Sequence, residues 1–288
     1  MRKLYAFAGI EFEVILPDGL RFDNERTLTP FRCDAVMEPH RFIFDLVERL
    51  SASDGICIAA EPALRVYEVG DVTVRYIGGV QQDLDHGYIR VETRGKEHRV
   101  ELKTSAFPAG VGIKAVLNSL TAEHLVAQNG GFVFHSSFVE YMGKGILFTA
   151  PSGTGKSTQA DLWQKHRDVV IINGDRSAIR VTEGGVVAHG IPFAGSSKIC
   201  LNKTLPLAAV VYLKQASQNR IRRLVGTEAF CRIWEGCSIN IWDKADVTAV
   251  ASTVQQVIDA VPVFELACTP DEMAVKTLEE ACKQEGIL

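Results

Sequence analysis

The chain has 288 residues, of which 47% are hydrophobic and 23% charged, a composition typical of a folded globular protein of one or two domains. Its 31 basic and 35 acidic residues give a net charge of −4, so no overall basic field favours nucleic acid or an anionic membrane. The longest apolar runs, such as residues 207–213, fall far short of the roughly 18 residues that a membrane-spanning helix needs.

Two further features concern the cellular location. Glu11 and Glu13 interrupt the apolar N-terminal stretch before a signal-peptide core is complete. The seven cysteines are scattered and contain no Cys-x-x-Cys motif, which predicts neither a disulfide framework nor a zinc site. We therefore expect a cytoplasmic protein.

The first part of the chain has the pattern of a β domain. Alternating segments bounded by turn residues predict strands over 9–16, 64–69, 72–77, 87–93 and 98–103. Segment 41–50 has apolar residues at helical spacing, although a strand is the alternative there. We predict an antiparallel β-rich N-terminal domain over residues 1–110.

The character of the chain changes after residue 110. Apolar residues on one helical face predict a helix over 110–130 that ends at Asn129-Gly130-Gly131 and marks the domain boundary. Strand and helix patterns then alternate, and the last helix is predicted to begin in Thr269-Pro270-Asp271-Glu272. Residues 111–288 are therefore predicted to form an α/β domain. Its expected strands are 132–141, 145–150, 169–173, 179–182, 186–191, 207–213, 220–225 and 263–266, and its other expected helices are 156–166, a segment carrying Phe230 to Cys237, and 246–260.

One motif in this second domain indicates chemistry. Residues 150–158 read Ala-Pro-Ser-Gly-Thr-Gly-Lys-Ser-Thr and match the phosphate-binding loop G-x-x-x-x-G-K-[ST], with alanine for the first glycine. A predicted strand leads into the loop and a predicted helix leaves it, so backbone N–H groups and the helix N-terminus can hold phosphates. Lys156 is expected to reach the β- and γ-phosphates, and the Ser157 hydroxyl to bind Mg²⁺. The predicted nucleotide-binding residues are Ser152, Gly153, Thr154, Gly155, Lys156, Ser157 and Thr158.

An acidic residue follows the next apolar strand, which ends in Asn173-Gly174-Asp175. A carboxylate at the end of a strand beside a phosphate loop is typical of a second ligand for the Mg²⁺ of a bound nucleotide. Asn-Gly-Asp is also favourable turn chemistry, which is the structural alternative for Asp175. The loop that precedes it favours the functional interpretation.

A histidine is predicted to lie beside the same loop. Residues 132–141 and 145–150 form a predicted hairpin, and pairing of Tyr141 with Ile146 would set His135 opposite Ser152, to within one or two residues. A lone histidine in an apolar strand is more often a packed core residue. The predicted register favours a role for His135 in the site.

The segment from His135 to Asp175 resembles the catalytic core of HPr kinase/phosphorylase and of the wider group that includes ATP-dependent phosphoenolpyruvate carboxykinase. In that family a histidine-bearing strand turns back through glycine into the phosphate loop, and an apolar strand ending in Asp-Asp follows. The resemblance is specific over about 45 residues, extends more loosely over about 132–200, and does not cover residues 1–110.

This resemblance implies ATP- and Mg²⁺-dependent phosphorylation of a hydroxyl group, either on a serine of a small carrier protein or on free serine, a sugar or a peptide. It implies that Lys156 and Ser157 are phosphate and metal ligands, that Asp175 is a metal ligand or catalytic base, and that His135 assists near the γ-phosphate. The chain departs from the family at Gly174, which replaces the first of the two aspartates. A single carboxylate must then bind Mg²⁺, accept the hydroxyl proton, or do each through water.

Two cations are candidate substrate contacts. Arg176 follows Asp175 directly, and Lys198 ends the small polar loop 189–198. Either side chain is suited to neutralise charge on a moving phosphoryl group. A solvated surface cation is the alternative for both.

Together these observations predict a mixed-sheet α/β kinase domain of the HPr kinase type, preceded by a smaller β-rich domain. Its expected ligands are ATP, Mg²⁺ and a hydroxyl-bearing small molecule, peptide or carrier protein, with neither nucleic acid nor membrane as partner. The N-terminal domain is expected to supply substrate contacts or a surface for homo-oligomer formation. The alternatives are a nucleotide-binding regulatory protein with little turnover, which Gly174 keeps open, and a phosphoenolpyruvate carboxykinase-like phosphotransferase, which the short chain disfavours.

Overall fold

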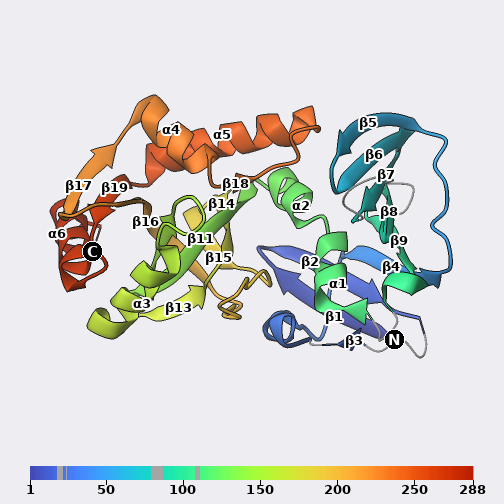
Figure 1. The fold of residues 1–288 in the computed structure, drawn as a ribbon, viewed down its shortest axis with the longest axis horizontal. Coiled ribbons are helices and arrows are strands. Elements are labelled where there is room, and N and C mark those ends of the chain that lie inside the picture. Colours follow the sequence, from blue (N-terminus) through green and yellow to red (C-terminus); the bar gives the residue numbers. More distant parts are fainter. Residues whose placement is uncertain (18–21, 24, 79–86, 108–110, 288) are drawn as a thin grey trace. The chain divides into compact units, whose positions relative to one another are not determined.

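The computed structural model describes residues 1–17, 22–23, 25–78, 87–107 and 111–287 (Figure 1). The chain divides into two compact units, Met1–Thr121 and Ala122–Leu288. The predicted helix over 110–130 is in fact two helices, α1 (Ile113–Ser119) and α2 (Ala122–Gln128). Thr121 lies between them with a φ of +51°, which an α-helix cannot contain, so the two helices are separate.

The first unit contains an eight-stranded sheet in the order β1-β2-β4-β9-β8-β7-β6-β5. Segment 41–50 lies largely in a strand, β4, because Phe42 and Phe44 are buried on one face while Asp45 points to the exposed face. The predicted antiparallel pairing is confirmed for β1–β2 and along β9-β8-β7-β6-β5, but it is wrong for β4, which runs parallel to both β2 and β9. The strands are β1 (Arg2–Phe7), β2 (Ile10–Ile15), β4 (His40–Val47), β5 (Ile56–Glu61), β6 (Leu64–Val69), β7 (Val72–Ile77), β8 (Ile89–Arg94) and β9 (Glu97–Lys103), with a separate short pair β3 (Phe22–Asp23) and β10 (Val111–Gly112).

The second unit is a mixed α/β structure. Its main path of strands is β12-β11-β14-β15-β16-β19-β17, and β12 also pairs with β16. The pairs β12–β16 and β16–β19 are parallel, whereas β11 is antiparallel to each of its partners. The strands are β11 (Gly131–Tyr141), β12 (Lys144–Thr149), β13 (Val170–Asn173), β14 (Arg176–Thr182), β15 (Gly185–Gly190), β16 (Thr204–Gln215), β17 (Arg220–Leu224), β18 (Cys237–Ser238) and β19 (Val263–Cys268).

Helices cover both faces of this sheet. Ile146 and Phe148 belong to a buried cluster with Trp163 of α3, whereas Leu147, which points to the opposite face, belongs to a cluster with Val254 of α5. Alternate side chains of β12 therefore belong to the two apolar layers on opposite faces of the sheet. No helix in the described part of the chain has both the length and the apolar character to cross a membrane. The helices are α3 (Lys156–Arg167) and α6 (Glu272–Gln284) on one face, and α4 (Gly226–Trp234) and α5 (Lys244–Ala260) on the other.

Two predicted helix boundaries are wrong by a few residues. The N-cap of α6 is Asp271, whose side chain accepts hydrogen bonds from the backbone N–H groups of Met273 and Ala274. Pro270 therefore precedes the helix and is not part of its first turn. Helix α4 ends at Trp234, and Cys237 lies in β18.

His189 in β15 makes stability depend on pH. It is buried, its Nδ1 lies 2.8 Å from Thr204 Oγ1, and burial lowers its pKa from 6.5 to about 4, with a further contribution from the charge of Arg180. In the unfolded chain the His189 imidazole takes up a proton near pH 6.5, whereas in the folded state it does so only near pH 4. The free energy of unfolding therefore decreases by up to about 3 kcal/mol as the pH falls from 6.5 to 4. Urea unfolding between pH 7 and 4.5 is expected to show a shallower pH dependence in His189→Gln than in the wild type.

His166→Gln, at a partly exposed position on α3, is the matched control, and this variant is expected to keep the pH dependence of the wild type. Identical pH dependence in His189→Gln and the wild type would contradict this role of His189.

Candidate functional site

The glycine-rich loop, residues 150–155, connects β12 to α3 in the way that the sequence predicts. Gly153 and Gly155 have φ values of +78° and +119°, a region that favours glycine, and Gly155 is the N-cap of α3. Ala150, which stands at the position of the first motif glycine, is buried in the cluster beneath α3, so its methyl group is part of the core. Ser152, Ser157 and Thr158 are exposed around the loop and Thr154 is partly exposed.

Lys156 is the buried cation of the site. Its side chain lies over the start of the loop, where Nζ donates hydrogen bonds to the carbonyl oxygens of Ala150 (3.0 Å) and Pro151 (3.4 Å). Burial lowers the pKa of Lys156, and the negative charge of Asp175 partly offsets this effect. The ammonium group is therefore held at the loop without a direct ion pair among the described residues.

His135 lies beside the start of the same loop, but through a register that differs from the prediction. Met142 and Gly143 both have positive φ values, +52° and +74°, and form a two-residue turn. Tyr141 therefore pairs with Lys144 and not with Ile146. In this register the last pair joins Ser136 to Thr149, and Thr149 Oγ1 donates to the His135 carbonyl oxygen at 3.0 Å.

Asp175 comes next to His135 because the chain turns sharply after β13. The Asn173 side chain accepts hydrogen bonds from the backbone N–H groups of Asp175 and Arg176, both at 3.1 Å, so the Asn173 side chain, and not the Asp175 carboxylate, forms the turn. Asp175 Oδ1 lies 3.6 Å from His135 Nε2, and Asp175 Oδ2 lies 3.9 Å from Arg176 Nε. Side-chain exposures of 36% for His135 and 35% for Asp175 leave both groups accessible to a ligand.

Burial, together with the charges around it, determines the protonation state of His135. Burial lowers its pKa, the ammonium of Lys156 lowers it further, and the carboxylate of Asp175 only partly opposes them. The imidazole is thus neutral at pH 7 and able to accept a proton.

Gly174 has no room for a side chain. A Cβ atom there would lie 2.0 Å from Ser197 Oγ, and a Cβ atom on Gly195 would lie 2.6 Å from Asp175 Cβ. The segment after β15 therefore packs directly against Gly174 and Asp175. This contact explains physically why one carboxylate, and not two, follows β13.

The two predicted substrate cations differ in their surroundings. Arg176 Nη1 lies 3.4 Å from Glu123 Oε1 and 3.5 Å from Ser238 Oγ, so this guanidinium is already engaged with side chains of its own unit. Lys198 is exposed, has a φ of +57°, and lies in the segment that packs against Gly174. The structure thus places Arg176 against Asp175 and Lys198 on the neighbouring loop.

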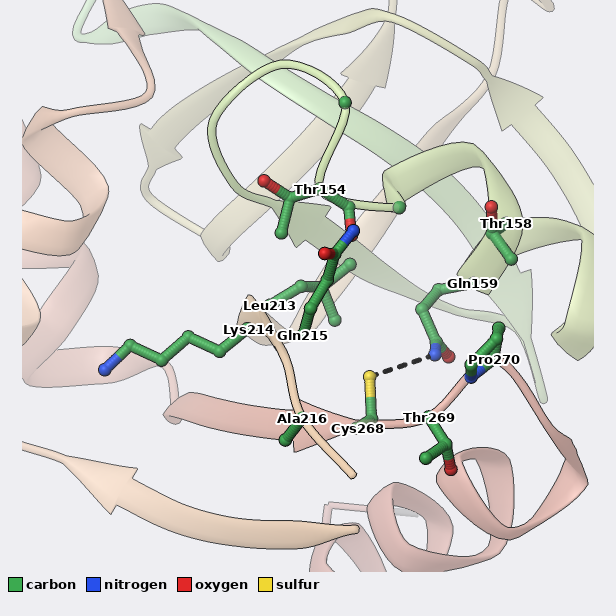
Figure 2. A pocket seen from close by; sticks show the side chains of 12 residues that line it. Thr154, Thr158, Gln159, Leu213, Lys214, Gln215, Ala216, Cys268, Thr269 and Pro270 are labelled. Atoms are coloured by element: carbon green, nitrogen blue, oxygen red, sulfur yellow. Dashed lines mark hydrogen bonds between the residues drawn. The ribbon is translucent and has the colours of Figure 1, made fainter. Parts of the chain in front are cut away.

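A pocket of about 430 Å³ opens on the glycine-rich loop (Figure 2). Its further walls come from the C-terminal ends of β16 and β19, which are adjacent because these strands pair in parallel. No sequence motif marks these residues of β16 and β19, because only the strand pairing brings them to the loop. The lining residues are Gly153, Thr154, Gly155, Thr158, Gln159, Leu213, Lys214, Gln215, Ala216, Cys268, Thr269 and Pro270.

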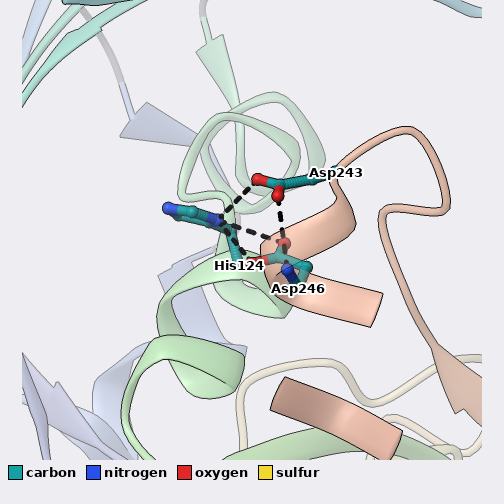
Figure 3. Close-up of side chains that lie close together, drawn as sticks. All are labelled: His124, Asp243 and Asp246. Carbon is teal, nitrogen blue, oxygen red and sulfur yellow. Dashed lines mark hydrogen bonds and ion pairs between the residues drawn. The ribbon is translucent and has the colours of Figure 1, made fainter. Parts of the chain in front are cut away.

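A second polar cluster lies between α2 and α5, where His124, Asp243 and Asp246 have a spacing compatible with a metal ion (Figure 3). Its hydrogen bonds point to a structural role. The buried Asp246 carboxylate lies 2.9 Å from His124 Nδ1 and accepts hydrogen bonds from Gln128 and Asn240, also at 2.9 Å. Burial raises the pKa of Asp246, but these hydrogen bonds outweigh it and hold the pKa below its ordinary value.

Asp246→Ala is expected to lower the free energy of unfolding by about 3 kcal/mol, because it leaves donors around a buried position without their shared acceptor. Urea unfolding at pH 7 measures this effect. Asp259→Ala, at an exposed position on the same helix, is the matched control and is expected to change stability by less than about 0.5 kcal/mol. A similarly small effect for Asp246→Ala would show that the cluster does not hold α2 and α5 together.

Comparisons with known proteins place the chain in a family. Among solved structures, the chain is similar to the Hpr(Ser) kinase/phosphatase from Coxiella burnetii, with 11% identity, a TM-score of 0.35, and coverage of 53% of this chain and 97% of the other. No curated protein matches the chain significantly. The family described as "SynChlorMet cassette protein ScmC" matches residues 111–270, more than half of the chain, so the protein belongs to the ScmC family.

Proposed function

We propose that the second unit is an ATP- and Mg²⁺-dependent kinase that transfers the γ-phosphoryl group to a hydroxyl group of a small molecule, a peptide or a protein serine. The observation that carries this proposal is the meeting of three groups at one glycine-rich loop: the Lys156 ammonium, the Asp175 carboxylate and the His135 imidazole. The loop sequence and its position between β12 and α3 support nucleotide binding.

Lys156, Asp175 and His135 each have a role in the proposed reaction. Backbone N–H groups at the start of α3 and the Lys156 ammonium would bind the β- and γ-phosphates. The acceptor oxygen forms a bond to the γ-phosphorus as the bond from that phosphorus to the β,γ-bridging oxygen breaks, which releases ADP. The hydroxyl proton passes to the Asp175 carboxylate, and His135, whose Nε2 lies 3.6 Å from Asp175 Oδ1, would assist near the γ-phosphate.

The oxygen donors near the loop fit a magnesium ion. The Ser157 hydroxyl at the first turn of α3 and the accessible Asp175 carboxylate are hard oxygen ligands of the kind that Mg²⁺ prefers. When bound, the ion would neutralise charge that develops on the phosphates. Arg176 and Lys198 remain proposed contacts for the phosphoryl group or its acceptor.

A direct assay tests the proposal. The full chain is incubated with Mg²⁺ and ATP labelled at the γ-phosphate, together with pools of hydroxyl-bearing metabolites, serine peptides and small proteins, and a labelled acceptor is expected. The same incubation without Mg²⁺ is the control. ATP binding without transfer to any acceptor would contradict kinase activity. That result would favour the alternative of a nucleotide-binding regulatory protein with little turnover, which the single carboxylate beside Gly174 supports.

A further inference from the structure

The pocket beside the glycine-rich loop differs chemically from the loop itself. Gly153, Thr154 and Gly155 line it, but Lys156, His135 and Asp175 do not. Its one charged lining residue, Lys214, points away from the pocket in Figure 2, and its Nζ lies 2.5 Å from Glu265 Oε2. The pocket is therefore suited to an uncharged organic group and not to phosphate.

Gln159 lines this pocket, and one polar atom of its side chain has no hydrogen-bond partner among the described residues. Its side chain is only 3% exposed, and its Nε2 donates to Cys268 Sγ at 3.3 Å (Figure 2). Its Oε1 is buried and has no hydrogen-bond donor among the described residues. A buried acceptor without a partner costs free energy, and a ligand that supplies an N–H or O–H group removes this cost.

Gln159 lines the pocket and also lies close to the glycine-rich loop. Its backbone N–H donates to the Gly155 carbonyl oxygen at 2.9 Å, so Gln159 lies one helical turn beyond the N-cap of α3. One turn advances about 5 Å along the helix axis. A group attached to a phosphate at the loop can therefore reach the Gln159 side chain.

We propose that this pocket holds the nucleoside of the bound nucleotide and that Gln159 Oε1 accepts a hydrogen bond from the amine of its base or from a ribose hydroxyl. This inference rests on the proposed function, because it takes the phosphates to lie at the glycine-rich loop. The base and ribose occupy the space between Thr158, the end of β16 and the end of β19. The hydrogen bond from Gln159 Nε2 to Cys268 Sγ holds the Gln159 amide in place.

Calorimetric titration of the full chain with ATP and with inorganic tripolyphosphate, both with Mg²⁺, tests the inference. The wild type is expected to bind ATP at least about tenfold more tightly than tripolyphosphate, because only ATP fills the pocket. Gln159→Met, which preserves volume but removes the amide, is expected to weaken ATP binding about tenfold and to leave tripolyphosphate binding unchanged. Gln164→Met, at an exposed position on the same helix, is the matched control and should change neither affinity.

Two analogues identify the group that Gln159 recognises. Purine riboside triphosphate lacks the base amine, and 2′-deoxy-ATP lacks one ribose hydroxyl. The analogue without the recognised donor is expected to bind the wild type about tenfold more weakly than ATP and to be insensitive to Gln159→Met. If Gln159→Met fails to fold, Ala216→Trp at the exposed rim of the pocket provides the same test, since it should remove the preference for ATP over tripolyphosphate.

The outcomes separate this inference from the proposed function. Equal binding of ATP and tripolyphosphate by the wild type, or an equal loss of both in Gln159→Met, would overturn the nucleoside pocket while leaving phosphate binding at the loop intact. Failure of the wild type to bind either ligand would overturn both proposals.

Discussion

Lys156→Met is expected to weaken ATP binding by about 100-fold, equivalent to about 3 kcal/mol, and to abolish measurable phosphoryl transfer. Lys156 is 8% exposed, and the two groups that its ammonium contacts directly are backbone carbonyl oxygens at the start of the loop. In the complex it would exchange these neutral acceptors for charged phosphate oxygens. The interaction lost on substitution is therefore stronger in the bound state than in the free protein.

The same substitution is not expected to unfold the protein. Because burial lowers the pKa of Lys156, the folded chain already loses free energy by keeping this charge out of water. Methionine fills a similar volume without that cost, so the melting temperature should stay the same or rise. Lys165→Met, exposed on the same helix, is the control and should retain ATP binding.

Calorimetry and a thermal melt of each variant measure these effects. A Lys156→Met protein that is folded and binds ATP as tightly as the wild type would rule out the proposed role of the glycine-rich loop.

The sequence predicts best those parts of the second unit that depend on local interactions. The order of β12, loop and α3 follows from an apolar run, two glycines with positive φ and a helical pattern, all within about 25 residues. The hairpin before the loop is also local, but its register depends on the turn at Met142 and Gly143. A two-residue turn and a four-residue turn are both compatible with that sequence, and the choice shifts the pairing of Tyr141 by two residues.

Features built from distant segments could not be predicted in this way. The pocket joins Gln159 to residues 213–216 and 268–270 through the parallel pairing of β16 with β19, which no short motif encodes. Asp246 meets Gln128 across 118 positions of the chain. The exclusion of a side chain at Gly174 is likewise a tertiary effect, because the atom that a Cβ would meet belongs to Ser197.

Asp175→Asn is expected to reduce phosphoryl transfer about 1000-fold while ATP affinity changes only a few-fold. Asparagine keeps the size of the side chain but cannot take up the hydroxyl proton, so the loss should fall on kcat and not on binding. The turn itself should survive, because its hydrogen bonds are accepted by Asn173 and not by Asp175. Asp161→Asn, at an exposed position on α3, is the matched control.

The dependence of the residual activity on Mg²⁺ separates the two roles that one carboxylate can play here. If Asp175 acts chiefly as a metal ligand, raising the Mg²⁺ concentration should restore much of the activity of Asp175→Asn, because the Ser157 hydroxyl and the phosphates still supply oxygen ligands. If it acts chiefly as the proton acceptor, excess Mg²⁺ should not restore activity. Transfer at the wild-type rate in Asp175→Asn would show that Asp175 is only a turn residue and that another group at the loop accepts the proton.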